Sequence, residues 1–367
     1  MCLVKKTAYF TRFFGYVILN TSYMELALYR KYRPQEFRDV RGQDELINVL
    51  SRQAKQNEVA HAYLFYGGRG TGKTTVARIF ARAAGVNPED LYEMDAASNR
   101  TIDDMRELRE AVRTLPFTSP RKCYIIDEVH MLTKEAYNAL LKTLEEPPAH
   151  VLFILATTNL EKVPETIISR CQTFAFKQPV IHDLTQYVVD VVSKEELLID
   201  AAAAELVALA GDGSYRDTLS VLEKVLTVAD GKKALSFDVV ARIIGAPRHE
   251  TINRILKGID SGNAEEALMA VRDADVEHVD MTFFMRLILL KLRAILLLRY
   301  APQMEAALAE EFSPDDVALL RSFAASPAKR INSHTLLEFL RTSELGKAAI
   351  VPTLPIEIAI MRAIGEK

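Results

Sequence analysis

A glycine-rich segment around residue 70 has the residue types and the spacing of a phosphate-binding loop. Residues 67–74 read Gly-Gly-Arg-Gly-Thr-Gly-Lys-Thr, which matches the pattern G-x-x-x-x-G-K-[ST]. The glycines allow backbone N–H groups to turn toward phosphate oxygens at the positive end of the helix that follows. Lys73 would reach the β- and γ-phosphates, and the hydroxyl of Thr74 would ligate Mg²⁺. An ordinary glycine turn is the alternative, but a predicted strand before the loop and a predicted helix after it favour phosphate binding.

Asp127 and Glu128 follow the apolar run Tyr124–Ile126 and form a second chemical signature. Asp127 is placed to hold the metal ion, and Glu128 can polarise the attacking water. By itself, an acidic pair after a strand is as typical of a solvated turn as of catalysis. Together with the phosphate loop, the pair predicts ATP hydrolysis rather than nucleotide storage.

Three further positions carry polar groups that suit phosphoryl transfer. Thr158 lies in a Thr-Thr-Asn string at the end of a predicted strand, where it either contacts the γ-phosphate or begins the next loop. Arg170 precedes the last strand-like run, and an arginine can stabilise phosphoryl-transfer charge, also from a neighbouring subunit. Arg216 begins a predicted helix, where a salt bridge is the alternative role.

The pattern of apolar residues predicts the elements that position these groups. Short β-type runs alternate with segments of helical periodicity, which indicates a parallel sheet covered by helices on both faces. One predicted helix begins after Thr101, whose side chain forms a capping box with Asp104, and its apolar face runs from Met105 to Leu115. The expected strands are residues 63–66, 92–95, 123–126, 151–156 and 172–176.

After Pro179 the sequence has little strand signal and becomes helical to its end. We expect an α/β unit over 24–179, a helical unit over 180–237 and a further all-helical unit over 238–367. The length of 367 residues agrees with two or three domains, since a single core rarely grows past about 250–300 residues. Basic residues interrupt the apolar run Met281–Tyr300, which therefore predicts a soluble helix rather than a membrane span.

Composition excludes several classes of protein. With 49% hydrophobic and 26% charged residues, the chain is neither disordered nor collagen-like. A formal net charge of -3 argues against nucleic-acid binding by bulk charge but leaves room for a local basic site. Cys2, Cys123 and Cys171 are too scattered for a disulfide framework or a zinc motif, which indicates a reducing compartment. Residues 1–23 are a short signal peptide or, as we prefer, a segment upstream of a true start at Met24.

Several longer strings carry a resemblance to a known family. The most specific are DEVHML at 127–132 and NALLKTLEEPP at 138–148, accompanied by YRKYRP at 29–34, RGQ at 41–43, HAYLF at 61–65, ATT at 156–158 and SRC at 169–171. Together they resemble the gamma/tau subunits of bacterial DNA polymerase III, the ATPases of the sliding-clamp loader. The resemblance is strongest over 25–230. It implies an AAA+ P-loop domain with a parallel sheet, then a small helical lid domain over 180–237 and an all-α collar domain over 238–367.

The resemblance also implies roles for individual residues in hydrolysis. Thr74 and Asp127 would hold Mg²⁺, and Glu128 would act on the attacking water. Thr158 would be the first sensor of the nucleotide. Lys73 would also take part in catalysis. The residues expected to hold the triphosphate are Gly67, Gly68, Arg69, Gly70, Thr71, Gly72, Lys73, Thr74 and Thr75.

Other implied roles concern residues outside the phosphate loop. Arg33 and Val40 would lie against the adenine. Arg216 would be the second sensor, which links the nucleotide to the lid, and Arg170 would be the finger that completes the neighbouring subunit's site. The residues expected to face the phosphates of DNA are Arg100, Lys142 and Thr166.

Two departures from the family pattern are visible. The four-cysteine zinc module of the family is replaced by Ala84–Asp90, a run without cysteine, so we expect no zinc. The chain ends at Lys367, just after the expected collar, as in the short gamma form. The resemblance implies a cytoplasmic protein, with no membrane. Its partners would be delta- and delta-prime-type subunits in a hetero-pentameric ring, the sliding clamp and primed DNA.

Two other interpretations stay open. The first is a catalytically silent structural subunit of the delta-prime kind, against which the intact Lys73, Asp127 and Glu128 argue. The second is a related AAA+ DNA motor, either a branch-migration helicase or an archaeal-type loader. The helicase should carry a C-terminal winged-helix domain, and the helical end of this sequence offers no such pattern.

Overall fold

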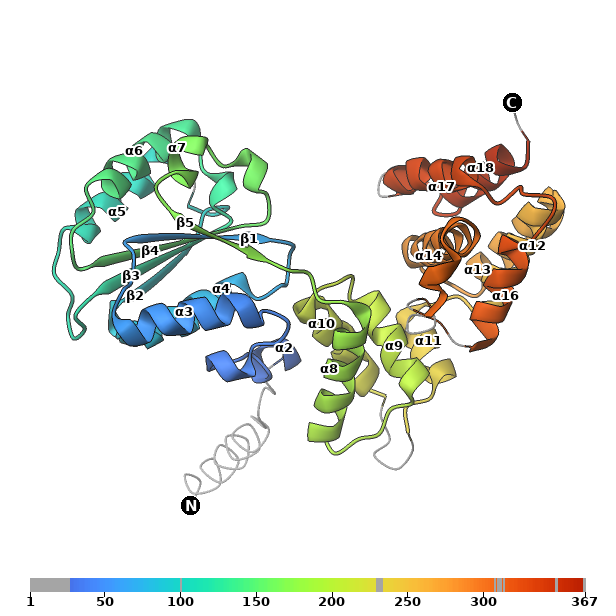
Figure 1. Cartoon of the computed structure of the whole chain (residues 1–367), viewed down its shortest axis with the longest axis horizontal. Helices are drawn as coiled ribbons and strands as arrows, with labels where there is room; N and C mark the ends of the chain where they lie inside the picture. Colours follow the sequence, from blue (N-terminus) through green and yellow to red (C-terminus); the bar gives the residue numbers. More distant parts are fainter. Residues whose placement is uncertain are drawn as a thin grey trace, which may run out of the picture.

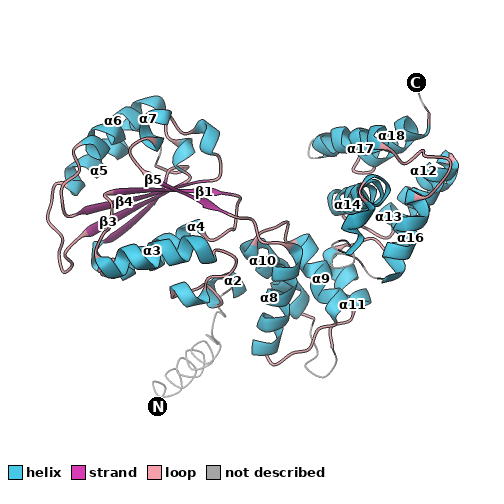
Figure 2. Ribbon diagram, in the orientation of Figure 1, coloured by secondary structure: helices cyan, strands magenta, loops and turns pink. Residues whose placement is uncertain are grey.

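A computed structural model describes residues 27–99, 101–228, 234–306, 308, 312, 314–346 and 349–365. The predicted extension 1–23, the alternative start Met24 and the predicted DNA contact Arg100 lie outside the described residues. The elements form three groups in chain order: an α/β body, a middle set of helices and a C-terminal set of helices (Figure 1). The named strands all lie in the α/β body, and the other two groups consist of helices and loops (Figure 2).

The α/β body is built on a five-stranded sheet with the strand order β2-β3-β4-β1-β5. Every pair of neighbouring strands is parallel, which confirms the predicted parallel sheet. The register places Asp95 opposite Asp127 and Tyr66 opposite Thr157, so the carboxyl ends of the strands align. The strands are β1 (Ala62–Gly67), β2 (Leu91–Asp95), β3 (Lys122–Asp127), β4 (Val151–Thr157) and β5 (Gln172–Phe176).

Helices cover both faces of this sheet, as the sequence predicts (Figure 1). Within β1, Tyr63 and Phe65 join the core under one set of helices, whereas Ala62 and Leu64 join the core under the other. This alternation follows from the two-residue period of a strand. One face is covered by α3 (Asp44–Gln56) and α4 (Lys73–Ala83), the other by α5 (Ile102–Val112), α6 (Lys134–Glu145) and α7 (Glu165–Ile168).

The start of α5 agrees with the sequence and its end does not. The predicted capping box is confirmed: Thr101 Oγ1 accepts the Asp104 N–H at 3.3 Å, and the Asp104 carboxylate accepts the Thr101 N–H at 2.8 Å. The helix ends at Val112, so the expected place of Leu115 on its apolar face is wrong. Leu115 is 75% exposed.

The reason lies in Asp90, a buried carboxylate that precedes β2. Its oxygens accept the backbone N–H groups of Phe117, Thr118 and Ser119 at 2.7, 2.9 and 2.8 Å. These bonds hold the loop after α5 in a non-helical path, and Pro116 supplies no N–H for a further helical turn.

The middle group packs around its own apolar core. It contains α8 (Ile181–Lys194), α9 (Ala201–Ala210), α10 (Tyr215–Leu226) and α11 (Phe237–Ile244), and the N-terminal α2 (Leu28–Lys31) packs on α10. The expected third unit begins at residue 238, inside α11. The structure instead packs α11 with α9 and α10.

The C-terminal group is all helical. Among the described residues of this group, the α-helices are α12 (His249–Ser261), α13 (Ala264–Val276), α14 (Met281–Tyr300), α16 (Pro314–Ala324), α17 (Ser333–Leu345) and α18 (Leu354–Ile364). The helix predicted at 281–300 is confirmed as α14, in which Lys291 is nearly buried and pairs with Asp316 at 2.6 Å. No helix among the described residues is both long enough and apolar enough to cross a membrane.

Candidate functional site

The carboxyl ends of β3, β4 and β1 are neighbours in the sheet, and the predicted chemical groups lie there. The glycine loop follows β1, Asp127 ends β3, and Thr157 ends β4. In parallel α/β sheets this end is where ligands bind. The fold therefore brings three separate segments of the sequence into one site.

Lys73 is the buried cation of the glycine loop. The residue is 6% exposed, and its ammonium donates to the carbonyl oxygens of Gly67 at 2.9 Å and Gly68 at 2.8 Å. Burial lowers the pKa of Lys73 below its ordinary value, while the nearby carboxylates of Glu128 and Asp127 act in the opposite direction. The ammonium is thus held inside the loop, where an anion can replace the two carbonyl oxygens as its hydrogen-bond acceptor.

Thr74 and Asp127 bring two oxygen donors together. The Thr74 hydroxyl donates to Asp127 Oδ2 at 2.7 Å across 53 positions of sequence. A hydroxyl and a carboxylate oxygen are hard ligands of the kind that Mg²⁺ prefers. The described residues contain no group of three or more His, Cys, Asp or Glu side chains that could hold a metal ion. Mg²⁺ usually keeps several waters and is held by one or two protein ligands together with substrate phosphates, a pattern that two oxygen donors from the chain would fit.

Glu128 occupies an unusual backbone conformation beside Asp127. Its φ of 48° lies in the left-handed region, which costs a residue other than glycine about 1–3 kcal/mol. Glu128 Oε2 accepts the N–H of Thr158 at 3.1 Å and its hydroxyl at 2.9 Å. The predicted water-activating group and the predicted first sensor are thus in direct contact.

The tip of the glycine loop touches the middle group of helices. Gly70 has a φ of +68°, and a Cβ at this position would lie 1.7 Å from the hydroxyl of Ser214. Ser214 is the N-cap of α10 and accepts the N–H of Asp217 at 3.1 Å. Arg69 pairs with Asp217 at 3.6 Å. The loop therefore contacts the start of α10 at two points, Gly70 with Ser214 and Arg69 with Asp217.

Arg216 lies on this same first turn. It is exposed, and its guanidinium lies 5.0 Å from the ring centroid of Tyr29, within range of a cation–π contact. Arg33 reaches the other side of the loop, where its Nε donates to the Thr75 hydroxyl at 3.0 Å. Val40 packs against the core under α3 and α4.

Arg170 and the predicted DNA contacts lie apart from these groups. Arg170 donates to Glu145 at 2.7 Å and to the carbonyl of Thr166 at 2.8 Å, and these are its hydrogen-bond partners in the described chain. Lys142 on α6 and Thr166 on α7 are exposed, and these two helices pack on each other. The structure does not bring Arg170 to the glycine loop of its own chain.

Sequence reasoning missed an apolar tip on the α/β body. Phe117 is 79% exposed and Leu115 is 75% exposed, on the loop that Asp90 holds. The sequence signal for this tip was the string Leu-Pro-Phe at 115–117 beside turn residues. It was overlooked because Leu115 also fits the helical periodicity of the preceding segment. Exposed apolar side chains on an ordered loop are suited to contact with another protein.

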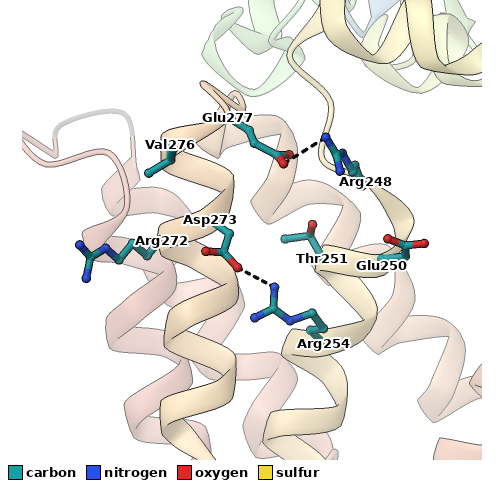
Figure 3. Close-up of a pocket in the computed structure, with 8 residues that line it drawn as sticks. All are labelled: Arg248, Glu250, Thr251, Arg254, Arg272, Asp273, Val276 and Glu277. Carbon is teal, nitrogen blue, oxygen red and sulfur yellow. Dashed lines mark hydrogen bonds and ion pairs between the residues drawn. The ribbon is translucent and has the colours of Figure 1, made fainter.

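A groove that lies away from these groups is formed between α12 and α13 (Figure 3). Its volume is about 310 Å³. Figure 3 shows Arg248 directed at Glu277 and Arg254 at Asp273, at distances of 3.2 and 2.6 Å. Its lining carries three arginines and three acidic residues, so the charges balance, and it includes none of the predicted site residues.

Comparisons with known proteins agree with the geometry at the sheet. A family profile described as "DNA polymerase III, delta subunit" matches residues 42–99 and 84–180. The tau subunit of DNA polymerase III from Bacillus subtilis is 38% identical over 77% of this chain, which spans 54% of that protein. The gamma subunit from Buchnera aphidicola is 34% identical over 76% of this chain, which spans 80% of that protein.

One solved structure is similar in fold. The RuvB Holliday junction branch migration motor of Thermotoga maritima superposes with a TM-score of 0.50 and is 24% identical. The superposition covers 62% of this chain and 79% of RuvB. At this level of identity the likeness concerns the fold alone.

Proposed function

The chain belongs to the gamma/tau subunit family of bacterial DNA polymerase III, and from that premise we propose that it is an ATP-hydrolysing subunit of a sliding-clamp loader. In this role it acts in DNA replication and helps to place the sliding clamp on primed DNA. The observation that carries the proposal is the convergence of Lys73, the Thr74–Asp127 pair and the Glu128–Thr158 pair at one end of the sheet.

The residues at this end fit ATP and Mg²⁺. When bound, ATP supplies the phosphoryl group and Mg²⁺ neutralises its charge. Lys73, which donates to two carbonyl oxygens, would donate to phosphate oxygens instead, and Thr74 and Asp127 would hold the metal ion. Glu128 accepts the proton of the attacking water, and Thr158 donates to a phosphate oxygen.

The rest of the nucleotide is held by backbone and side chains around the loop. The main chain and hydroxyls of Gly67–Thr75 enclose the triphosphate. Arg33 and Val40 lie beside α4 and would contact the adenine. Arg216 would contact the bound nucleotide and so link nucleotide binding to the position of the middle helices. The contact of Gly70 with Ser214 supports a link between the glycine loop and α10.

Arg170 acts on a neighbouring subunit. Its guanidinium is half-exposed and held by Glu145, away from the loop of its own chain, so it is available at the surface of the α/β body. A guanidinium supplied from outside stabilises the charge of the transferring phosphoryl group. Hydrolysis then depends on assembly with delta- and delta-prime-type subunits in a hetero-pentameric ring.

The sequence predicts an ATPase domain over 24–179, a lid over 180–237 and a collar over 238–367, and we propose this division with the boundary between lid and collar moved to the end of α11. The packing of α11 with α9 and α10 favours a lid that extends to the end of α11. Lys142 and Thr166, exposed on adjacent helices, face DNA in this proposal together with Arg100. Contacts of this kind position a duplex without reading its sequence.

The test is the ATPase activity of the full chain assembled with its partner subunits. We expect hydrolysis to rise when sliding clamp and primed DNA are added together, and to fall in the Arg170→Ala complex with ATP affinity retained. Lys73→Ala should lose ATP affinity. An unchanged rate with and without clamp and primed DNA would refute the proposal.

The same experiment decides between the other interpretations. A catalytically silent subunit would show equal nucleotide binding for the native chain and Lys73→Ala. A branch-migration motor, the second interpretation of the sequence, is tested by the same assembly of proteins and DNA. That motor would track duplex DNA in the absence of any clamp.

A further inference from the structure

His130 lies at the predicted catalytic end of the sheet without a role so far. It belongs to a short 3-10 segment, Val129–Met131, that follows Glu128. Tyr137 fixes this segment, because its hydroxyl donates to the carbonyl of Val129 at 2.7 Å in a buried environment. The side chain of His130 is 11% exposed and its Nδ1 points at two oxygens.

Those two oxygens determine which ring nitrogen carries the proton. Nδ1 lies 2.9 Å from the hydroxyl of Thr157 and 3.3 Å from Glu128 Oε2. The Thr157 hydroxyl already donates its proton to the carbonyl of Asn159 at 3.1 Å, so it must accept from His130. A carboxylate oxygen also only accepts. The tautomer with the proton on Nδ1 fits both contacts: its N–H donates to Thr157, and the same N–H edge of the ring lies beside Glu128 Oε2.

This arrangement places two hydrogen bonds from Thr158 and a longer contact of 3.3 Å from His130 Nδ1 on one oxygen of Glu128. Oε2 faces the N–H of Thr158, the hydroxyl of Thr158 and Nδ1–H of His130. The other carboxylate oxygen takes part in none of these contacts. Under the proposed function the Thr158 hydroxyl turns to a phosphate oxygen, which removes one donor. His130 stays in place, because fully buried Thr157 anchors it.

We propose that His130 is a positioning residue for Glu128: its Nδ1–H, anchored by Thr157, holds Oε2 so that Oε1 is the oxygen presented to the attacking water. The inference rests on the proposed ATPase function and deepens it. His130 does not exchange a proton with substrate. It fixes the direction of the carboxylate that does.

The test uses the loader assembled from the full chain and its partner subunits, with ATP affinity and steady-state hydrolysis measured separately. His130→Ala should lower kcat about tenfold, a part of the 10²–10⁴-fold that a general base contributes, with unchanged ATP affinity. His130→Asn places an amide N–H near the position of Nδ1–H and should restore most of the rate. In a Glu128→Gln background, His130→Ala should cause no further loss, because the two residues act as one unit.

Three results would overturn the inference: native kcat in His130→Ala, no rescue by His130→Asn, or an additive loss in the Glu128→Gln background. A fall in ATP affinity equal to the fall in kcat would also overturn it, since it indicates damage to the fold. If the native complex itself does not bind or hydrolyse ATP, the proposed function fails as well.

A spectroscopic measurement is independent of activity. The ring ¹⁵N shifts of His130 in the full chain, assigned by comparison with His130→Asn, should show the tautomer protonated at Nδ1. A ring protonated at Nε2 alone would contradict the arrangement.

Discussion

Replacing Gly70 by alanine tests the contact between the glycine loop and α10. The added Cβ would lie 1.7 Å from the Ser214 hydroxyl oxygen and 2.7 Å from its Cβ, so loop and helix cannot both keep their positions. The φ of +68° adds strain for any residue with a Cβ. Gly72 is a matched control, because it also has a positive φ, of +100°, but a Cβ there meets no atom within 4 Å.

The magnitudes follow from these two terms. Left-handed strain costs about 1–3 kcal/mol at either glycine. Overpacking against Ser214 adds about 1–3 kcal/mol at Gly70 alone. Ser214→Gly removes the overlapping side chain, and as an N-cap change it costs only about a few tenths of a kcal/mol. Adding Ser214→Gly should therefore restore the stability that Gly70→Ala loses through overpacking, and it should restore no stability to Gly72→Ala.

The assay is calorimetric unfolding of the full chain without nucleotide, for the single and the double variants. One kcal/mol shifts the melting temperature of a unit of 150–250 residues by about 2–4 °C. Gly70→Ala should melt lower than Gly72→Ala, and Ser214→Gly should raise the melting temperature only in the Gly70→Ala background. Equal melting temperatures for the two alanine variants, or no rescue by Ser214→Gly, would show that the loop and α10 do not pack as described.

Three further predictions concern other parts of the chain. Lys291→Met should destabilise the C-terminal helices by up to about 3–5 kcal/mol in thermal unfolding, because it removes the ammonium that pairs with nearly buried Asp316 at 2.6 Å, and adding Asp316→Leu should recover part of the loss. Burial raises the pKa of Asp90, but the N–H groups of residues 117–119 outweigh it, so the pKa lies below the ordinary 3.8. The stability that Asp90 contributes is therefore present above pH 3.8 and lost as pH falls through the lower folded pKa. The difference in melting temperature between the native chain and Asp90→Asn should shrink from pH 7 to pH 2, and a constant difference would contradict this. Under the proposed function, Leu115→Ser with Phe117→Ser should weaken sliding-clamp binding about tenfold with unchanged ATP affinity, because the double change removes the two exposed apolar side chains of the tip. The measurement is a surface-binding assay, and unchanged clamp affinity would exclude this tip from that interface.

The order of strands and helices could be predicted because their signals are local. Strands β1, β3 and β4 are built on short apolar runs, and the Thr101–Asp104 capping box is predicted from two residues that lie three positions apart. Leu115 was placed wrongly because helical periodicity continues past Val112, while the carboxylate that redirects the chain belongs to Asp90, distant in sequence. Periodicity predicts which helix face a residue can occupy. It does not predict that a distant side chain accepts hydrogen bonds from the backbone N–H groups and so ends the helix.

The chemical groups of the site could be predicted from local sequence: the phosphate loop 67–74, the acids Asp127 and Glu128, and the sheet whose strand ends carry them. The contacts that these groups make could not, because they depend on the folded chain. The tertiary structure placed Lys73 on two carbonyls, Glu128 on Thr158 and His130, and Ser214 against Gly70. The physical reason is range. Backbone propensity and motif spacing act over a few residues, whereas the hydrogen bonds that orient a side chain depend on whatever the folded core brings beside it.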